Sequence, residues 1–331
     1  MRSWLLAGIL AILAAGCSRE ARPVDARGRQ ILRLGYMPNL THAPALLGIG
    51  TGFFEERLGP GVAIDAKAFN AGPSVIEAVF AGDLDVAYVG PNPAINGFVR
   101  SRGTALRIVA GSTSGGAALV VQPDIRDAAM LDGRRLAVPS IANTQDVSLR
   151  TWLRKNGLSA KDEGGTVEVL PIASADTLTL FRRGELAGAW VPEPTVSRLV
   201  LEAGGVVLVD ERSQWPSGNY PTTEVIASAV ALRERPELVR AFVAAHEAAV
   251  QRLVQEPGPS RRAVESYLSE RMHLKLPPEV RERAFEQLGF GVDPLAAELE
   301  VLAERARNLG YLPSSPGIEG ILDLRFLGGA D

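Results

Sequence analysis

Short runs of small polar residues follow several expected strands, and each run leads into an expected helix. The positions that stand out are Asn39, Thr41, His42, Gly72, Pro91, Asn92, Ser114, Gly115, Asn143, Thr144 and Gln145. Unpaired backbone N–H groups and positive partial charge at a helix start attract anions, and hydroxyl and amide side chains add donors. None of these runs contains arginine or lysine. The pattern therefore favours a small oxyanion held by dipoles, provided that the runs meet at one crevice.

A second feature is the run Trp-Val-Pro-Glu-Pro at 190–194, at the end of an expected strand. Facing the same crevice, Trp190 would form an apolar wall for a ligand. Glu193 would accept a hydrogen bond from an ammonium group or another donor. The alternative interpretation places Trp190 in the core and leaves Glu193 as an exposed acid at a helix start.

Alternating strands and helices are expected to position these residues. Periodicity predicts strands at 31–36, 62–69, 86–89, 106–110, 118–121, 134–138, 167–170, 187–191, 206–209 and 223–228. Helices are expected at 43–49, 74–82, 143–156, 174–183 and 194–203, with another after the turn at 90–93. The tail is mostly helical, at 236–255, 260–271, 278–288 and 295–308. Short strands that alternate with helices indicate an α/β fold with parallel pairing.

The pattern restarts after the fourth strand, which indicates two α/β lobes. We expect lobe I to comprise residues 31–113 and 224–331, and lobe II residues 114–223. The long helical tail would pack on lobe I. Ligands of such sheets bind outside the carboxyl ends of the strands, here in the crevice between the lobes.

The N-terminus has the features of a secretion signal. A positive Arg2 precedes an apolar run at 4–15, which is shorter than the roughly 20 residues that a spanning helix needs. Small residues then lead to Cys17, the one cysteine of the chain, as in a bacterial lipoprotein signal, although Ala14 stands where Leu or Val is usual. We expect a signal peptide at 1–16, lipidation of Cys17 and a tether at 17–30. A plain signal peptide is the alternative.

Composition excludes several classes of protein. The 331 residues carry 35 Lys and Arg against 38 Asp and Glu, a net charge of −3, which weighs against nucleic-acid binding. One cysteine and three histidines provide no cluster for zinc or iron–sulfur, so we expect no metal and no cofactor. A serine hydrolase would need an intact Gly-x-Ser-x-Gly turn, which the run at 111–116 does not supply.

Several segments together resemble the nitrate, sulfonate and taurine group of solute-binding proteins that serve ATP-binding cassette importers. The landmarks are the stretches 35–38 (GYMP), 52–54 (GFF), 69–72 (FNAG), 81–87 (AGDLDVA), 131–139 (LDGRRLAVP) and 184–190 (GELAGAW). The likeness covers about 32–244. Single pieces are weak motifs, whereas their order and spacing are fairly specific.

The resemblance implies a two-lobed periplasmic-binding-protein fold of type II, with Rossmann-like lobes. It implies a protein without catalysis, tethered in the cell envelope, that delivers a small organic anion to a permease and its ATPase. By position it implies ligand contacts from Asn39, Thr41, Gly72, Pro91, Asn92, Ser114, Gly115, Thr144, Gln145 and Glu193. An aliphatic sulfonate or taurine is favoured. Nitrate, a phosphonate, a thiamine-precursor pyrimidine or a periplasmic enzyme on the same fold stay open.

Overall fold

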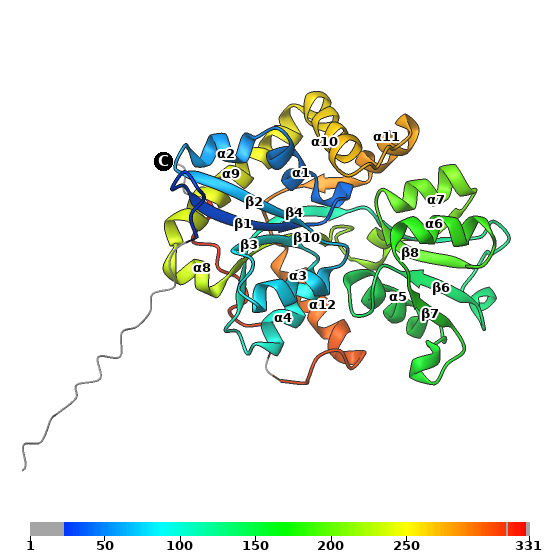
Figure 1. Ribbon diagram of the computed structural model, residues 1–331. Helices are drawn as coiled ribbons and strands as arrows, with labels where there is room; N and C mark the ends of the chain where they lie inside the picture. Colours follow the sequence, from blue (N-terminus) through cyan, green and yellow to red (C-terminus); the bar gives the residue numbers. More distant parts are fainter. Residues whose placement is uncertain (1–22, 316, 329–331) are drawn as a thin grey trace, which may run out of the picture.

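The computed structural model describes residues 23–315 and 317–328, which form two sheets with helices on both faces of each (Figure 1). We call sheet A and its helices lobe I, and sheet B and its helices lobe II. The signal peptide, Cys17 and most of the tether lie outside the described residues. Among the helices of the described part, none combines the length and apolar character that crossing a membrane requires.

Sheet A has six strands in the order β11-β4-β10-β3-β1-β2. Their bounds are β1 Gln30–Tyr36, β2 Val62–Ala68, β3 Val86–Val89, β4 Leu106–Gly115, β10 Pro221–Ser228 and β11 Leu288–Phe290. Strands β2, β1 and β3 pair in parallel, so their carboxyl ends point the same way. Strand β10 runs antiparallel between β3 and β4.

Helices cover sheet A on both faces (Figure 1). One face packs against α1 Ala43–Gly50, α2 Phe53–Leu58, α9 Pro236–Gln255 and α10 Pro257–Arg271, whose apolar side chains share a core with β1. The other face packs against α3 Gly72–Phe80, α4 Pro91–Arg100 and α12 Ala296–Asn308. Two short helices, α8 Ala229–Glu234 and α11 Pro278–Glu286, complete the lobe.

Sheet B has five strands in the order β7-β6-β8-β5-β9. Their bounds are β5 Ala117–Val121, β6 Arg135–Val138, β7 Glu168–Pro171, β8 Gly188–Pro192 and β9 Val206–Asp210. Helix α5 Thr144–Lys155 packs on one face. Helices α6 Ser174–Arg182 and α7 Thr195–Ala203 pack on the other.

Both sheets are mixed, which corrects the expectation of parallel pairing. Strand β10 is antiparallel to both of its neighbours in sheet A, and β5 is antiparallel to β8 and β9 in sheet B. The physical reason is the path of the chain: β4 leads straight into the other lobe, and β10 returns from it in the opposite direction. The sequence pattern of β10 is that of any buried strand and does not specify its direction.

The tail also differs from the expected run of helices. The segment expected to be helical to residue 288 leaves its helix at Glu286, and Leu288–Phe290 becomes β11. This strand pairs with β4 at Thr113, Ser114 and Gly115. The glycine-rich end of β4 is therefore held as a strand by partners distant in sequence, and it extends past the expected lobe boundary, as does the start of β10 at Pro221.

The two lobes contact each other on two sides of the crossovers. On one side, α12 lies against α5: Arg154 Nη1 donates to the carbonyl of Asn308 at 2.7 Å, and the Tyr311 hydroxyl donates to Asp146 at 2.5 Å. On the other side α11 lies against α7 (Figure 1), where an Arg283 nitrogen is 3.9 Å from a Glu193 oxygen. The two lobes thus contact each other through both of these helix pairs.

Candidate functional site

The N-terminus of α4 in lobe I meets the N-terminus of α5 in lobe II. The backbone N–H of Asn92 points at the Thr144 hydroxyl oxygen across a long contact of 3.5 Å. A side chain at Gly90, just before α4, would approach the same hydroxyl. Helix N-termini carry positive partial charge, so two that face each other gain most when an anion lies between them.

Two further chain turns approach the same junction from lobe I. Helix α3 begins at Gly72, where a Cβ would overlap the ring of Pro93 in the first turn of α4. The 3₁₀ turn Leu40–His42 packs against the strands β4 and β10. The lack of a side chain at Gly72 therefore lets the starts of α3 and α4 lie together at the carboxyl ends of β2 and β3.

Buried polar side chains without a hydrogen-bond partner inside the protein gather at these same elements. Those at these elements are Asn92 Oδ1, Ser112 Oγ, Thr113 Oγ1, Thr223 Oγ1 and both carboxyl oxygens of Glu224, which we call the interlobe polar cluster. Ser140 Oγ and Trp215 Nε1 also lack a partner, at other places in the described fold. A buried polar group without a partner costs about 1–3 kcal/mol. Such groups are rare in folded proteins, so their concentration here marks a site where a ligand can supply the partners.

Glu224 is the most unusual member of the interlobe polar cluster. It is fully buried on β10, opposite Val89 of β3 and Gly111 of β4. A side chain at Gly111 would collide with the backbone carbonyl of Asp293, so the segment before α12 covers this part of the sheet. Burial, and secondarily the negative charge of Asp293, raises the pKa of Glu224 well above its usual range.

The second-lobe residues expected at the site lie at the start of α5. Asn143 caps this helix by accepting from the N–H of Asp146 at 2.9 Å, and its amide donates to Gln145 at 3.2 Å. Asn143, Thr144 and Gln145 are all buried. Of the three, the structure brings Thr144 against lobe I.

The first expected turn of lobe I is held by hydrogen bonds between its own residues. The Asn39 side-chain oxygen accepts from both the N–H and the hydroxyl of Thr41, at 2.9 and 2.6 Å. His42 is buried, and its Nδ1 accepts from the N–H of Met37 at 3.3 Å. Burial lowers the pKa of His42 to about 3, so its imidazole is neutral at physiological pH.

The glycine-rich end of β4 places its hydroxyls differently from the expectation. Ser114 pairs with Pro221 and Gly289, and a Cβ at Gly289 would meet its hydroxyl. The carbonyl of Gly115 accepts from the Thr222 hydroxyl at 2.5 Å. The unpartnered hydroxyls are those of the preceding residues, Ser112 and Thr113. The structure thus favours 112–113 over 114–115 as the polar lining from this strand.

Trp190 belongs to the core of lobe II and does not face the interlobe polar cluster. Its side chain is fully buried, lies beside the ring of Trp152, and donates from Nε1 to Glu211 at 2.7 Å. Trp190 lies on the face of β8 that α5 covers, which the sequence alone does not reveal. The role as a ligand wall is therefore not supported by its position.

Glu193 is fully buried, in contrast to the exposed alternative, but its carboxylate is bound within its own helix start. Its oxygens accept from the N–H and the hydroxyl of Ser197, at 3.0 and 2.9 Å. Burial raises the pKa of Glu193 to about 7, and the Ser197 bonds oppose that shift. It borders a cavity of about 140 Å³ with Arg212 and Arg283, away from the α4–α5 contact.

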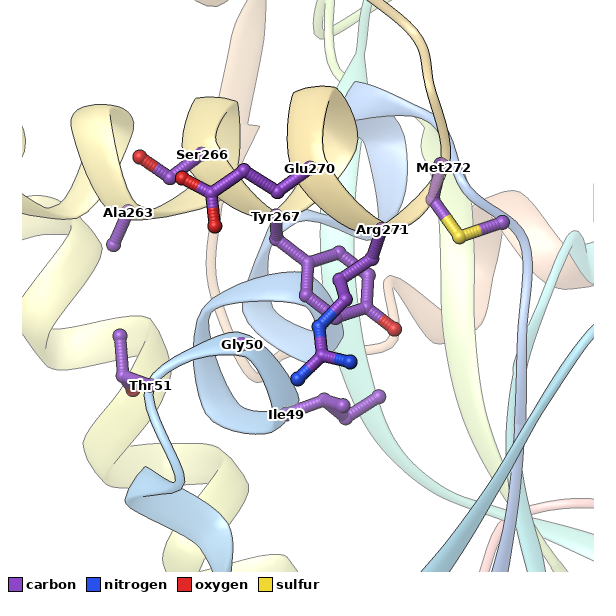
Figure 2. Close-up of a pocket in the computed structure, with 9 residues that line it drawn as sticks. All are labelled: Ile49, Gly50, Thr51, Ala263, Ser266, Tyr267, Glu270, Arg271 and Met272. Atoms are coloured by element: carbon purple, nitrogen blue, oxygen red, sulfur yellow. The ribbon is translucent and has the colours of Figure 1, made fainter.

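A larger hollow lies on the outer side of lobe I, between the end of α1 and α10 (Figure 2). Its volume is about 510 Å³, and Tyr267, Arg271 and Met272 are among the residues that line it. None of the residues that the sequence singled out lines this hollow. Across the described residues, no group of three or more His, Cys, Asp or Glu side chains is arranged to hold a metal ion.

Comparison with known proteins agrees with this architecture. The sequence pattern of the NMT1-like family matches residues 25–267. The chain belongs to the NMT1-like family. Over 200 residues it is 29% identical to the taurine-binding periplasmic protein of Escherichia coli K12, an alignment that covers 60% of this chain and 59% of that protein. The chain thus matches about three fifths of the length of this relative.

Solved structures share the fold at lower identity. The alkanesulfonate-binding protein SsuA from Xanthomonas axonopodis pv. citri, bound to MOPS, superposes with a TM-score of 0.74 at 21% identity, covering 89% of this chain and 98% of that one. The periplasmic nitrate-binding protein NrtA from Synechocystis PCC 6803 gives 0.71 at 16%, covering 86% and 83%. The predicted two-lobed periplasmic-binding-protein fold is confirmed. The lipoprotein form falls outside the described residues.

Sequence reasoning missed the members of the interlobe polar cluster on β4 and β10. Ser112 and Thr113 belong to the same glycine-rich run as the expected contacts Ser114 and Gly115, but they stand two positions earlier. Thr223 and Glu224 come directly before the apolar residues 225–227 of β10. An acidic residue inside a strand that becomes fully buried was the available signal.

Proposed function

We propose that this protein is the solute-binding component of an ATP-binding cassette importer and that it captures a small organic anion, an aliphatic sulfonate or taurine, between its lobes. The observation that carries the proposal is the meeting of the α4 and α5 N-termini beside buried polar groups without partners. The names of the taurine- and sulfonate-binding relatives support the ligand class. The protein acts by binding and release, without catalysis.

In this mechanism lobe I captures the anionic head group first. The N–H groups at the starts of α3 and α4 and the hydroxyls of Thr113 and Thr223 are its donors. Rotation about the crossovers at 115–117 and 214–221 then brings the α5 N-terminus with Thr144 onto the ligand. The closed lobes form the shape that the permease recognises, and its ATPase then drives import.

The proposal includes an envelope location. The expected signal peptide and the lipidation of Cys17 would tether the protein outside the cytoplasmic membrane, with residues 17–30 as the spacer. Tethering would keep the binding protein close to its permease and raise its local concentration there. Mass spectrometry of the membrane fraction, with and without a Cys17→Ala substitution, tests this part separately.

The first experiment is calorimetric titration of residues 18–331 with taurine, ethanesulfonate, a phosphonate, nitrate and a thiamine-precursor pyrimidine. Saturable 1:1 binding of a sulfonate without turnover is the expected result. Binding of one of the other classes alone would keep the fold and change the substrate. Absence of any binding would contradict the proposal.

A matched pair of variants locates the site. Thr144→Val removes the hydroxyl at the α5 N-terminus and is expected to weaken sulfonate binding about tenfold, the effect of losing one hydrogen bond to a charged group. Thr151→Val changes the same residue type farther along α5 and leaves affinity unchanged. Equal affinities in both variants would place the ligand elsewhere.

A further inference from the structure

The interlobe polar cluster contains two kinds of groups. Ser112, Thr113 and Thr223 carry hydroxyls, which can donate to an anion. Asn92 Oδ1 and the carboxyl oxygens of Glu224 are acceptors, which an anion cannot satisfy unless the carboxyl is protonated. A ligand with only a sulfonate head group therefore leaves the second kind without partners.

The acceptors lie near one another in the fold. Glu224 is opposite Val89, and Asn92 follows Val89 by three residues, at the start of α4. The Asn92 amide nitrogen reaches the carbonyl of Leu302 in α12, while Asp293 before α12 acts electrostatically on Glu224. Both acceptors thus lie on the part of the sheet that α4 and α12 cover, next to Gly90, where Thr144 of lobe II approaches.

Within the described part of the chain, neither carboxyl oxygen of Glu224 has a hydrogen-bond partner. Burial, and secondarily the like charge of Asp293, raises the pKa of this carboxyl. Glu193 differs, since Ser197 binds both of its oxygens and Arg283 lies nearby. Glu211 also differs, because Ser148 and Trp190 donate to it. A buried carboxylate is stable only when a partner of opposite charge or several donors accompany it.

We propose that Glu224 and Asn92 form an ammonium subsite, so that the ligand is zwitterionic: an aminoalkanesulfonate whose sulfonate meets the helix N-termini and hydroxyls while its ammonium donates to Glu224. This inference rests on the proposed function and narrows its substrate class. The three N–H donors of an ammonium match the two carboxyl oxygens and Asn92 Oδ1. Closure of lobe II then excludes water from both ends of the ligand.

Three ligands of nearly equal size test the subsite in the wild-type protein: taurine, isethionate, which has a hydroxyl in place of the ammonium, and ethanesulfonate, which has neither. Calorimetric titration should give taurine a dissociation constant at least about tenfold lower than the other two, because they leave a buried carboxyl unpaired. Equal affinities for the three would overturn the ammonium subsite and leave the proposed function standing. Binding of none would contradict the proposed function itself.

The variant Glu224→Gln separates charge from shape. It should lose most of the preference for taurine, by about tenfold or more, while affinity for isethionate stays within about twofold of wild type. An unchanged preference would show that Glu224 acts as a neutral group and would refute the proposal. Circular dichroism and the melting temperature confirm that the variant is folded.

Glu193→Gln is the matched control, since it changes an equally buried glutamate at the edge of lobe II. It should lower the melting temperature through the loss of its carboxylate at the α7 N-terminus and leave the ligand preference intact. A loss of taurine preference in this variant and not in Glu224→Gln would transfer the subsite to Glu193.

Discussion

The Glu211 network in lobe II and the interlobe polar cluster both contain buried carboxyl and hydroxyl groups, yet only in the Glu211 network are these groups paired within the protein. In lobe II, Glu211 accepts from Ser148 at 2.6 Å and from Trp190 at 2.7 Å. Arg150, buried in α5, bonds Asp146 at 2.7 Å and reaches Asp162. On strands β4 and β10 of sheet A, Glu224 and the hydroxyls of Thr113 and Thr223 have no such partners.

This difference separates groups that serve folding from groups available for binding. A paired buried group stabilises the chain on its own, whereas an unpaired one lowers stability until a ligand supplies the missing contact. Burial alone therefore does not distinguish the two, because Glu193, Glu211 and Glu224 are all fully buried. The two kinds of groups are distinguished by whether each has a hydrogen-bond partner within the protein.

The largest expected effect is a loss of stability when the paired Glu211 network of lobe II is disrupted. Glu211→Ala leaves the hydroxyl of Ser148 and the indole N–H of Trp190 buried without an acceptor. The free energy of unfolding should fall by about 3–5 kcal/mol, measured by urea denaturation. Glu211→Gln, which keeps one acceptor, should cost less. If both variants were as stable as wild type, the lobe II network would not contribute to folding.

The second expected effect concerns the pH dependence of stability. Because the pKa of Glu224 is raised in the folded protein, the folded state holds more protons than the unfolded state above the ordinary value of 4.5. Its contribution is complete below that value and declines as pH rises, by up to about 1.4 kcal/mol per pH unit.

Glu224→Gln removes this decline and leaves the similar contributions of Glu193 and Glu211 in place. The difference in unfolding free energy between the variant and the wild type should therefore grow between pH 5 and 8, in urea titrations of ligand-free protein. A difference that is constant with pH would mean that Glu224 titrates normally.

A smaller effect is expected where the paired network reaches the other lobe. Tyr311→Phe removes the hydroxyl that donates to Asp146 across the interface of α12 and α5. The loss should be about 1 kcal/mol in unfolding free energy. Small-angle scattering of the ligand-free variant should also show a more open average shape. An identical scattering profile would exclude this bond from the closed arrangement.

The smallest effect on stability is expected for a substitution in the interlobe polar cluster. Thr223→Val removes a buried hydroxyl that has no partner in the protein, so the free energy of unfolding should change by less than about 0.5 kcal/mol or rise slightly. Sulfonate affinity should nevertheless fall about tenfold. Ser148→Ala is the control: it should lose stability and keep affinity. The opposite result, in which Thr223→Val loses stability and Ser148→Ala loses affinity, would contradict the proposed difference between the two regions.

Much of the fold followed from local pattern. Alternation and helix-start signals located nearly every strand and helix, including the cap at Asn143, because these depend on neighbours within four residues. The short helices α2 and α8 and strand β11 were not expected. Strand β11 has only three residues, and its pairing with β4 is a tertiary contact between residues more than 170 positions apart.

The candidate site could be predicted only in part from the sequence. Asn92 and Thr144 were expected, and the structure brings them together across the lobes. Trp190 and Glu193 have the chemistry expected of ligand contacts, yet Glu211 and Ser197 already bind their polar groups. A sequence displays which residues can form hydrogen bonds, but it does not display which of them are already paired.

The order of the elements and the two-lobed class of fold could be read from the sequence, because each depends on local periodicity and residue type. The anion bound without arginine or lysine stays a prediction from residue type. The direction of β10, the pairing of β11 and the set of buried polar groups without a partner appear only in the tertiary structure. These depend on hydrogen bonds between segments far apart in the chain. Glu224 becomes significant only there, where folding buries its carboxyl and brings it no partner.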